Sequence, residues 1–436
     1  MVSFDSDAQG AWVKVTMKWF FYNALFTVVY FAMLPSFLLR MKRRGGYKAR
    51  MGDRFARYPD DILAALSSDC ASRIWVHAVS VGEVQVAGQL MRAIREADPS
   101  VRFVFSTTSS TGWRIAEKEV ADDDILIYNP LDFPGLVKKS FDLIRPQAII
   151  LTETEIWPNF IREAKKRSVP LFLANARISD RSAPRYKALK CFFGEVFRCF
   201  TKIYAQSDLD ASRLADAGAD SERMEVTGSF KFDVAKRRPE KETELRDWIG
   251  AGRMLLGGST WPGEDEALLR IFSDLPEDVK LVIAPRHFEK ADAVEENIRR
   301  AGFECVRRSR GDKPVEGAVY LADATGELMG LYGIASAVFV GKSVTAHGSQ
   351  NMIEPCAAGK PTVVGPNTEN FRPVMSDLLA ADAIVQAKDA AGVESAIRGW
   401  FENGDGGLGE RAAKAVASRK GVVGECAGEI LGRMAK

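Results

Sequence analysis

Residues 337–371 read AVFVGKSVTAHGSQNMIEPCAAGKPTVVGPNTENF, and their order of apolar and small polar residues indicates the fold class. The stretch begins with four apolar residues, Ala337–Val340, which are typical of a short buried strand. The small and polar residues from Gly341 to Ser349 follow, where a backbone can approach a ligand closely. A short helix is expected from about Gln350 to Ala358, and Lys360–Val364 is the next strand. Strand, loop, helix and strand in this order predict a parallel α/β unit.

The loop of this unit is a candidate anion site, because free N–H groups point outward where a helix begins. Glu354 lies in the first turn of the expected helix, where a carboxylate can accept hydrogen bonds from sugar hydroxyls. The run Glu264-Asp265-Glu266 opens another expected helix and would repel phosphate. We therefore expect the anion at Gly348–Asn351, with Ser259 and Thr260 as auxiliary donors. An ordinary turn with a capping glutamate is the structural alternative.

The same alternation of strands and amphipathic helices extends along the chain from residue 74. The first series of expected strands is Ile74–Ser80, Arg102–Thr107, Ile125–Asn129, Ala148–Thr152, Leu171–Asn175, Lys202–Ala205 and Met224–Gly228. The second series is Met254–Gly258, Leu281–Pro285, Glu304–Arg308, Val319–Ala322, Ala337–Val340, Pro361–Val364 and Ala383–Val385. Such alternation indicates a parallel sheet covered on both faces, so the fold class is α/β with two Rossmann-like domains.

The two series are separated by the charged segment Lys231–Arg246, which is typical of a linker. We expect an N-terminal membrane anchor with a basic juxtamembrane segment at 1–54 and a Rossmann-like acceptor domain at 55–235. A linker at 236–250 and a nucleotide-binding domain at 251–436 follow, with the last helix a candidate to pack back on the first domain. Two such domains facing each other would place the carboxyl ends of both sheets on one cleft.

Trp19–Leu39 is an apolar stretch without any charged residue, long enough to cross the roughly 30 Å core of a bilayer. Basic residues are concentrated behind it rather than before it: Arg40, Lys42, Arg43, Arg44, Lys48, Arg50 and Arg54. This order is the reverse of a cleaved signal peptide and favours an uncleaved anchor, with the rest of the chain in the cytoplasm. A buried core helix and a helix lying flat on the membrane are the alternatives.

Composition narrows the class of function. The 436 residues carry a formal net charge of +2, which argues against a general nucleic-acid binder. The six cysteines are scattered without metal-ligand spacing, so neither a zinc site nor a disulfide framework is expected. The three histidines, His77, His287 and His347, each fall at or directly after the end of an expected strand.

Polar residues with useful chemistry follow strand after strand. Those of the first domain are Ser80 and Glu83, Glu153 and Glu155, and Arg177; those of the second are Ser259, Thr260, Arg286, His287 and Lys342, together with Gly348, Ser349, Asn351 and Glu354. Helix capping is the alternative for each of them taken singly. An acid-rich wall opposite a phosphate-binding wall would suit the transfer of a group from a nucleotide to a hydroxyl.

These residues lie in blocks that resemble the Kdo transferase family, the 3-deoxy-D-manno-octulosonic acid transferases. The blocks, in the family's order, are HAVSVGE (77–83), ETEIWPN (153–159), NARISDRS (175–182), TGSFKFD (227–233), APRH (284–287), HGSQNMIEP (347–355), GKPTVVGP (359–366) and TENF (368–371). The resemblance runs from the apolar N-terminal stretch to about Arg372. One departure is the loop GKSVTAHGSQN, where the family commonly has more glycine and a second histidine.

The resemblance implies a GT-B glycosyltransferase fold and inverting transfer of Kdo from CMP-Kdo to a lipid A precursor, lipid IVA. It implies Glu83 as general base, Arg286 and Glu354 with their loops on the CMP moiety, and Glu155 on the acceptor or Kdo side. It also implies that no metal cofactor is needed and that the enzyme works at the inner membrane, with its catalytic domains in the cytoplasm.

Two other classes of function remain open from the residues. One is a sugar-nucleotide epimerase on the same two-domain fold, or another GT-B transferase, which would use a UDP-sugar. The other is a membrane-tethered binding protein without activity. Stabilisation by CMP rather than UDP would separate the first from a Kdo transferase, and a biological effect that survives substitution of Glu83 would indicate the second.

Overall fold

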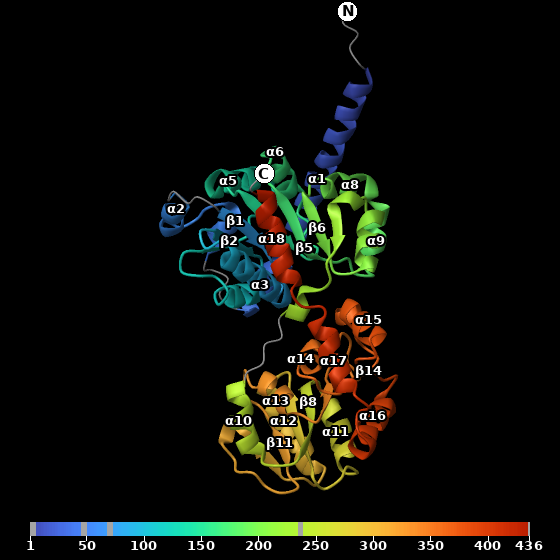
Figure 1. The fold of residues 1–436 in the computed structure, drawn as a ribbon. Coiled ribbons are helices and arrows are strands. Elements are labelled where there is room, and N and C mark those ends of the chain that lie inside the picture. Colours follow the sequence, from blue (N-terminus) through green and yellow to red (C-terminus); the bar gives the residue numbers. More distant parts are fainter. Residues whose placement is uncertain (1–5, 45–49, 68–72, 234–238, 435–436) are drawn as a thin grey trace, which may run out of the picture. The chain divides into compact units, whose positions relative to one another are not determined.

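The structure is a computed structural model, and it describes residues 6–44, 50–67, 73–233 and 239–434. The chain divides into two units (Figure 1). Unit 1 is Met1–Phe230 with Val422–Lys436, and unit 2 is Lys231–Gly421. Each contains a seven-stranded sheet in which all the paired strands are parallel. The two parallel sheets confirm the α/β fold class.

In unit 1 the strand order is β3-β2-β1-β4-β5-β6-β7. The strands are β1 Arg73–His77, β2 Arg102–Thr107, β3 Ile125–Tyr128, β4 Ala148–Thr152, β5 Leu171–Ala176, β6 Lys202–Ala205 and β7 Met224–Val226. The helices are α1 Ser6–Arg44, α2 Asp60–Ser67, α3 Val81–Ala97, α4 Ser110–Ala116, α5 Pro134–Ile144, α6 Pro158–Lys166, α7 Ala183–Ala188, α8 Lys190–Phe197, α9 Asp208–Asp216 and α18 Val422–Met434.

Unit 2 repeats the plan with the strand order β10-β11-β9-β8-β12-β13-β14. Its strands are β8 Arg253–Thr260, β9 Val279–Pro285, β10 Cys305–Arg307, β11 Val319–Leu321, β12 Ala337–Val340, β13 Thr362–Val364 and β14 Val385–Gln386. Its helices are α10 Pro239–Ile249, α11 Glu264–Phe272, α12 Ala291–Arg300, α13 Leu328–Ile334, α14 Ile353–Ala357, α15 Arg372–Ala380, α16 Ala390–Asn403 and α17 Leu408–Ala417.

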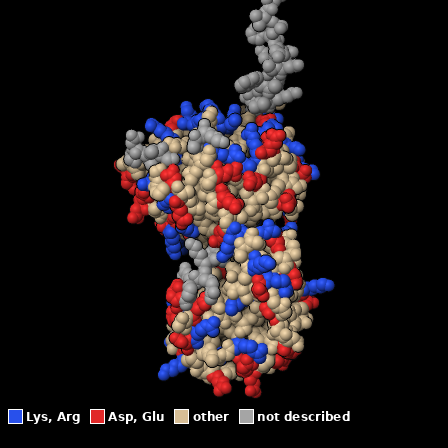
Figure 2. Space-filling model, in the orientation of Figure 1, with Lys and Arg blue, Asp and Glu red and all other residues tan. Residues whose placement is uncertain are grey.

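Both faces of each sheet are buried, which explains why the strands are apolar throughout rather than alternating. In β1, Trp75 points into one core cluster of unit 1 while Ile74 and Val76 point into the other. In β8, Leu256 and Leu255 divide between the two clusters of unit 2 in the same way. Charged side chains of both signs are mixed over the visible surface (Figure 2), in keeping with the net charge of +2.

The strand order locates the place in each sheet where a ligand is expected. In an open parallel sheet, ligands bind beyond the carboxyl ends of the strands where the strand order reverses. In unit 1 the reversal lies between β1 and β4, and in unit 2 between β8 and β12. The loops that follow these four strands carry most of the candidate residues.

Every expected strand is present, with ends shifted by a few residues. Two other expectations need correction, one about a helix and one about a linker. The expected helix at 350–358 is only the five-residue α14, so Gly348–Asn351 is a turn and not a helix N-terminus. Most of the expected linker at 236–250 is α10, because Leu245 and Trp248 give this charged segment an apolar face that is buried in unit 2.

The C-terminal helix α18 does not continue unit 2. It packs on α3 of unit 1, where Val423, Cys426, Ala427 and Ile430 are buried in the same cluster as Val84 and Met91. The chain thus returns to its first unit for the last helix, as Figure 1 shows.

Candidate active site

In unit 1 the acidic candidates gather where β1 and β4 end. Glu83 lies in the first turn of α3, after the loop that follows β1, and Glu153 and Glu155 lie directly after β4. The two strands are neighbours, and the Thr152 hydroxyl donates to the His77 carbonyl oxygen at 3.0 Å. The sequence prediction that these carboxylates lie on one side of the domain therefore agrees with the strand order.

Glu83 is also part of a helix cap. Its side chain is 8% exposed and accepts a hydrogen bond from the Val79 N–H at 3.0 Å. Ser80, a candidate on the sugar side, is the N-cap of α3, and its hydroxyl accepts from the Glu83 N–H at 3.3 Å. This resembles a capping box, in which the glutamate reaches back to the chain before the helix. The cap fixes the Glu83 carboxylate and leaves one oxygen atom outside that bond.

Glu155 is the most perturbed carboxylate of the group. Burial, followed by the negative charges of Glu83 and Glu153, raises its pKa to about 8, against a smaller opposing effect of the hydrogen bond from Trp157. The Trp157 indole N–H donates to Glu155 Oε2 at 3.1 Å. Glu155 therefore keeps its proton at neutral pH, and a perturbed carboxyl beside a second carboxylate is typical of a functional site.

The side chain of His77 lies next to that of Glu155. Burial lowers the pKa of this fully buried histidine to about 4, so the ring is neutral. Nδ1 lies 3.0 Å from the Ser106 carbonyl oxygen, which can only accept, so we assign the proton to Nδ1. Nε2 is then an acceptor; it has no hydrogen-bond partner among the described residues and lies 3.8 Å from Glu155 Oε2. The protonated carboxyl of Glu155 is thus a potential donor close to this nitrogen, although 3.8 Å is too long for a hydrogen bond.

Glu153 and Arg177 form an ion pair at the same end of the sheet. Arg177 follows β5, and its Nε lies 3.3 Å from Glu153 Oε2. Glu153 has a left-handed backbone, with φ of 51°, and its N–H donates to the Ala174 carbonyl oxygen. The sharp turn aims Glu153 at Arg177, while Glu155 turns toward His77.

In unit 2 the loop after β12 is organised by a residue that we did not expect there. Glu264 at the start of α11 is 1% exposed, and its carboxylate accepts from the N–H groups of Lys342, Ser343 and Val344 at 2.7–3.0 Å. It also accepts from the Trp261 N–H at 2.8 Å. The run 264–266 opens α11 as expected, and Glu264 has a role that the sequence did not indicate, because its carboxylate is itself the anion that the loop binds.

Gly341 allows this contact. A Cβ atom at this position would lie 2.4 Å from the Ser259 carbonyl oxygen and 2.8 Å from a Glu264 carboxylate oxygen. The end of β8, which includes Ser259 with φ of 53°, and the loop after β12 thus meet backbone to backbone. The N–H groups of Lys342–Val344 are therefore not available to a phosphate.

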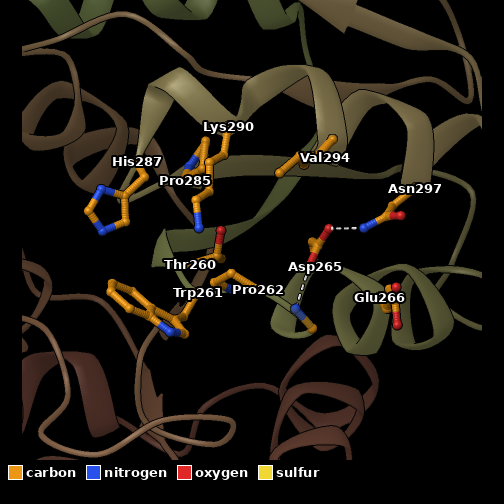
Figure 3. Close-up of a pocket in the computed structure, with 12 residues that line it drawn as sticks. Thr260, Trp261, Pro262, Asp265, Glu266, Pro285, His287, Lys290, Val294 and Asn297 are labelled. Carbon is orange, nitrogen blue, oxygen red and sulfur yellow. Dashed lines mark hydrogen bonds between the residues drawn. The ribbon is translucent and has the colours of Figure 1, made fainter.

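A pocket of roughly 190 Å³ opens beside these loops, between the ends of β8 and β9 (Figure 3). The rings of Trp261 and His287 lie at one end, 5.0 Å apart, and the Asp265–Asn297 hydrogen bond of 2.8 Å closes the other. Thr260 and Lys290 also line the pocket. Lys342 lies nearby, with Nζ 5.2 Å from the centre of the Trp261 ring.

Arg286 follows β9 and is anchored by its backbone, since its N–H donates to the Thr260 carbonyl oxygen at 3.0 Å. Its side chain is exposed, and its guanidinium has no ion pair or hydrogen bond within the part of the chain that the structure describes. Five N–H donors on a rigid planar group are suited to a phosphate or carboxylate. Arg286 is thus a cation of unit 2 that is available to a ligand.

Several hydrogen-bond donors of the turn Gly348–Asn351 are already bonded to other residues of unit 2. The N–H groups of Ser349 and Gln350 donate to the carbonyl oxygens of Lys342 and Gly341. Asn351 Nδ2 donates to Glu354 Oε1 at 3.0 Å, which holds the carboxylate beside the turn. Burial raises the pKa of Glu354, against the smaller opposing effect of this bond. The turn therefore presents Glu354 and Asn351 as a bonded pair rather than a ring of free N–H groups.

The structure thus groups the sequence-predicted residues by unit. Sequence reasoning missed Glu264 as the residue that holds the loop after β12, and it missed that His77 lies 3.8 Å from Glu155. A glutamate three residues after Trp261, at the start of a helix, is a capping-box signal that could have indicated Glu264. No group of three or more His, Cys, Asp or Glu side chains in the described ranges is arranged to hold a metal ion.

Comparison with known proteins gives the family. A family model described as 3-deoxy-D-manno-octulosonic-acid transferase (kdotransferase) matches residues 49–234. The 3-deoxy-D-manno-octulosonic acid transferase of Haemophilus influenzae is 31% identical over 380 residues, which cover 85% of this chain and 88% of the relative. That of Bordetella pertussis is 34% identical over 371 residues, which cover 80% of this chain and 84% of the relative.

Solved structures show the same fold at low sequence identity. A glycosyltransferase from Rickettsia africae aligns with a TM-score of 0.57 and 15% identity, over 84% of this chain and 99% of its own. An Anabaena protein solved with UDP has a TM-score of 0.57 at 13% identity, over 83% of this chain and all of its own. These likenesses show the two-domain GT-B fold, and the sequence relatives show the family: this chain belongs to the 3-deoxy-D-manno-octulosonic acid (Kdo) transferases, which are glycosyltransferases.

Proposed function

We propose that this Kdo transferase moves Kdo from CMP-Kdo to a lipid A precursor, lipid IVA, with inversion at the anomeric carbon. The observation that carries the proposal is the group of three carboxylates at the ends of β1 and β4, with Glu83 fixed by the cap of α3. A base held in place is what removal of a hydroxyl proton requires.

In this reaction an acceptor hydroxyl attacks the anomeric carbon of Kdo, and a new carbon–oxygen bond forms. The bond from that carbon to the CMP phosphate oxygen breaks, and CMP leaves with the electron pair. The hydroxyl proton passes to Glu83. Glu155, which is protonated at neutral pH because burial raises its pKa to about 8, is a hydrogen-bond donor toward the sugar or acceptor.

Unit 2 supplies the donor side of the proposal. Arg286 is exposed and free to meet the CMP phosphate, and Glu354 is positioned by Asn351 to accept from ribose hydroxyls. The pocket beside Thr260, Trp261 and His287 is large enough for one ring of a ligand rather than a whole nucleotide. With arginine available for the leaving phosphate, the reaction is proposed to need no metal ion.

The proposal includes a location at a membrane, because a lipid acceptor is reached at a bilayer surface. We place the enzyme at the inner membrane, with its catalytic units in the cytoplasm. One helix of the described residues, Met17–Leu39, is long and apolar enough to cross a membrane by length and composition.

The test is incubation of the purified protein with freshly generated CMP-Kdo and tetraacyl lipid A precursor, followed by mass spectrometry of the lipid. Addition of one or more Kdo units is expected, both with and without EDTA. Parallel thermal shifts should show stabilisation by CMP and not by UDP. No transfer combined with stabilisation by UDP would point to a sugar-nucleotide enzyme of another kind, and a strict need for magnesium would contradict the metal-free mechanism.

A further inference from the structure

The N-terminal helix α1 has two different faces along Met17–Leu39. The inward face packs on unit 1. Trp19 is 6% exposed, with its ring 5.4 Å from that of Phe192 and under the guanidinium of Arg162 at 4.6 Å. The Tyr22 hydroxyl donates to the buried Asp132 at 2.8 Å. Trp19 belongs to the core of unit 1, so this part of α1 is not a free-standing anchor.

The inward contacts continue along the helix. Asn159 Nδ2 donates to Asn23 Oδ1 at 2.7 Å, and the Phe26 and Tyr30 rings lie 5.2 and 5.5 Å from that of Phe133. At the two ends, Lys18 Nζ lies 2.5 Å from Glu195 Oε1, and the Arg54 guanidinium lies 5.5 Å from the centre of the Phe37 ring. From Lys18 to Phe37 the rise of a helix is about 28 Å.

The outward face is apolar and exposed. Phe20, Phe21, Leu25, Val28 and Phe31 are 60–67% exposed, and Leu38 and Leu39 are 44% and 51% exposed. Of the seventeen exposed large hydrophobic residues of the described chain, ten lie in Met17–Leu39. So many on one helix form a patch that indicates an interaction surface rather than ordinary surface leucines.

We infer that α1 does not cross the bilayer but lies along its surface, with this outward face in the boundary between lipid headgroups and acyl chains. If α1 crossed the bilayer, the residues of unit 1 that contact its inward face would also lie within the bilayer. These contacts extend over about the thickness of the hydrocarbon core. Those partners include Glu195, Arg162 and Asp132. Moving ionisable groups into hydrocarbon is strongly unfavourable.

The partner that fits is an anionic lipid bilayer. The apolar stretch is flanked in sequence by Lys14 before it and by Arg40, Lys42 and Arg43 after it. Basic residues beside an apolar helix face are attracted to the negative surface of such a membrane. The inference rests on the proposed membrane location but not on the reaction. It places the N-terminus on the same side of the membrane as the two units.

The first experiment tests the face. Full-length protein is floated with vesicles of phosphatidylglycerol and phosphatidylethanolamine. The double variant Phe21→Ser, Phe31→Ser should bind at least tenfold more weakly, with unchanged circular dichroism. The matched control is Leu209→Ser, Phe288→Ser, at positions 52% and 53% exposed outside α1, and it should bind like the unaltered protein. If the α1 variant and the control variant bind the vesicles equally, the inference is overturned. It is also overturned if the α1 variant changes only the self-association of the protein.

The second experiment separates lying from crossing. A fluorophore is placed on a cysteine at position 21, 28 or 38 in a Cys191→Ser background, and its depth is measured with brominated lipids. A helix along the surface predicts similar shallow depths at all three positions. A crossing helix predicts position 28 near the centre and the others near the two surfaces, which would overturn the inference while leaving the membrane location and transfer activity intact. Absence of any vesicle binding would instead contradict the membrane location itself.

Discussion

The Glu83 carboxylate has a structural role, because it caps α3, and it is also the proposed catalytic base. The variant Glu83→Gln separates them, since the amide oxygen can still accept from the Val79 N–H while basicity is lost. Transfer should fall about 10²–10⁴-fold, with CMP binding unchanged. The measurement is single-turnover transfer with CMP affinity in parallel. A variant with near-normal kcat would exclude Glu83 and make Glu153 or Glu155 the next candidate.

Glu155 gives unit 1 a pH-dependent stability. Its pKa is raised from 4.5 to about 8 in the folded state by burial and by the charges of Glu83 and Glu153. Below about 4.5 both states are protonated, and the stabilising contribution is complete. As the pH rises toward 8, the unfolded chain loses this proton while the folded one keeps it, so stability falls. The slope is at most about 1.4 kcal/mol per pH unit.

The variant Glu155→Gln removes this dependence, because the amide stays neutral at every pH. Its thermal midpoint should therefore rise relative to that of the unaltered protein between about pH 5 and pH 8. Glu96→Gln, at an exposed position on α3, is the control and should follow the unaltered protein. Parallel curves for Glu155→Gln and the unaltered protein would show that Glu155 ionises normally and that its contact with His77 is incidental.

Glu354 is the residue-scale test of the donor side. Its partner Asn351 holds it at the turn, and the hydrogen bonds that it would make to ribose hydroxyls are charge-assisted. Glu354→Ala should weaken CMP binding by roughly 1.5–3 kcal/mol, or about 10- to 150-fold. Calorimetry measures this directly. Unchanged CMP affinity would show that Glu354 only braces the turn.

At the scale of elements, the loop after β12 is held to the start of α11 by one carboxylate. Glu264→Ala would leave the N–H groups of Lys342, Ser343 and Val344 without this acceptor, that of Ser343 buried and the other two half-buried. The loss of stability should be on the order of 3 kcal/mol, because each buried unsatisfied donor costs about 1–3 kcal/mol. Urea unfolding measures the loss.

The neighbouring Glu266 provides the control for this loop. It lies on the same helix but is exposed, so Glu266→Ala should change the free energy of unfolding by less than about 0.5 kcal/mol. Hydrogen exchange should also speed up at residues 342–345 in the Glu264 variant alone. If both variants unfold alike, the loop is held by Gly341 and its close packing rather than by Glu264.

At the scale of the whole molecule, the last helix belongs to the first unit. Ending the chain at Gly421 would remove Val423, Cys426, Ala427 and Ile430 from the core they share with α3. Burial of each large apolar side chain contributes about 1.5–3 kcal/mol, so unit 1 should be clearly destabilised. Hydrogen exchange in α3 and β6 should accelerate, while unit 2 and CMP binding stay unchanged. Faster exchange confined to unit 2 would contradict this assignment.

Local pattern was enough to predict the elements of both units. Apolar runs bounded by small residues gave every strand to within a few residues, because a strand buried on both faces is marked by its own composition. One of the amphipathic helices expected between the strands is α3, whose buried face carries Val84, Ala87, Met91 and Ile94. The charged segment before β8 was predicted to be a linker, but most of it forms the helix α10. Its many charged residues hide the apolar face that Leu245 and Trp248 bury in unit 2.

By itself, the sequence determined the alternation of strands and helices, the motif blocks at strand ends and the apolar stretch of α1, because each of these is written in neighbouring residues. Which of these residues contact one another is known only from the folded chain. Glu264 binds N–H groups that begin 78 residues later, His77 lies beside Glu155, and α1 turns one face to unit 1. Such pairings depend on which strands lie side by side and on burial, and neither is encoded in a local period.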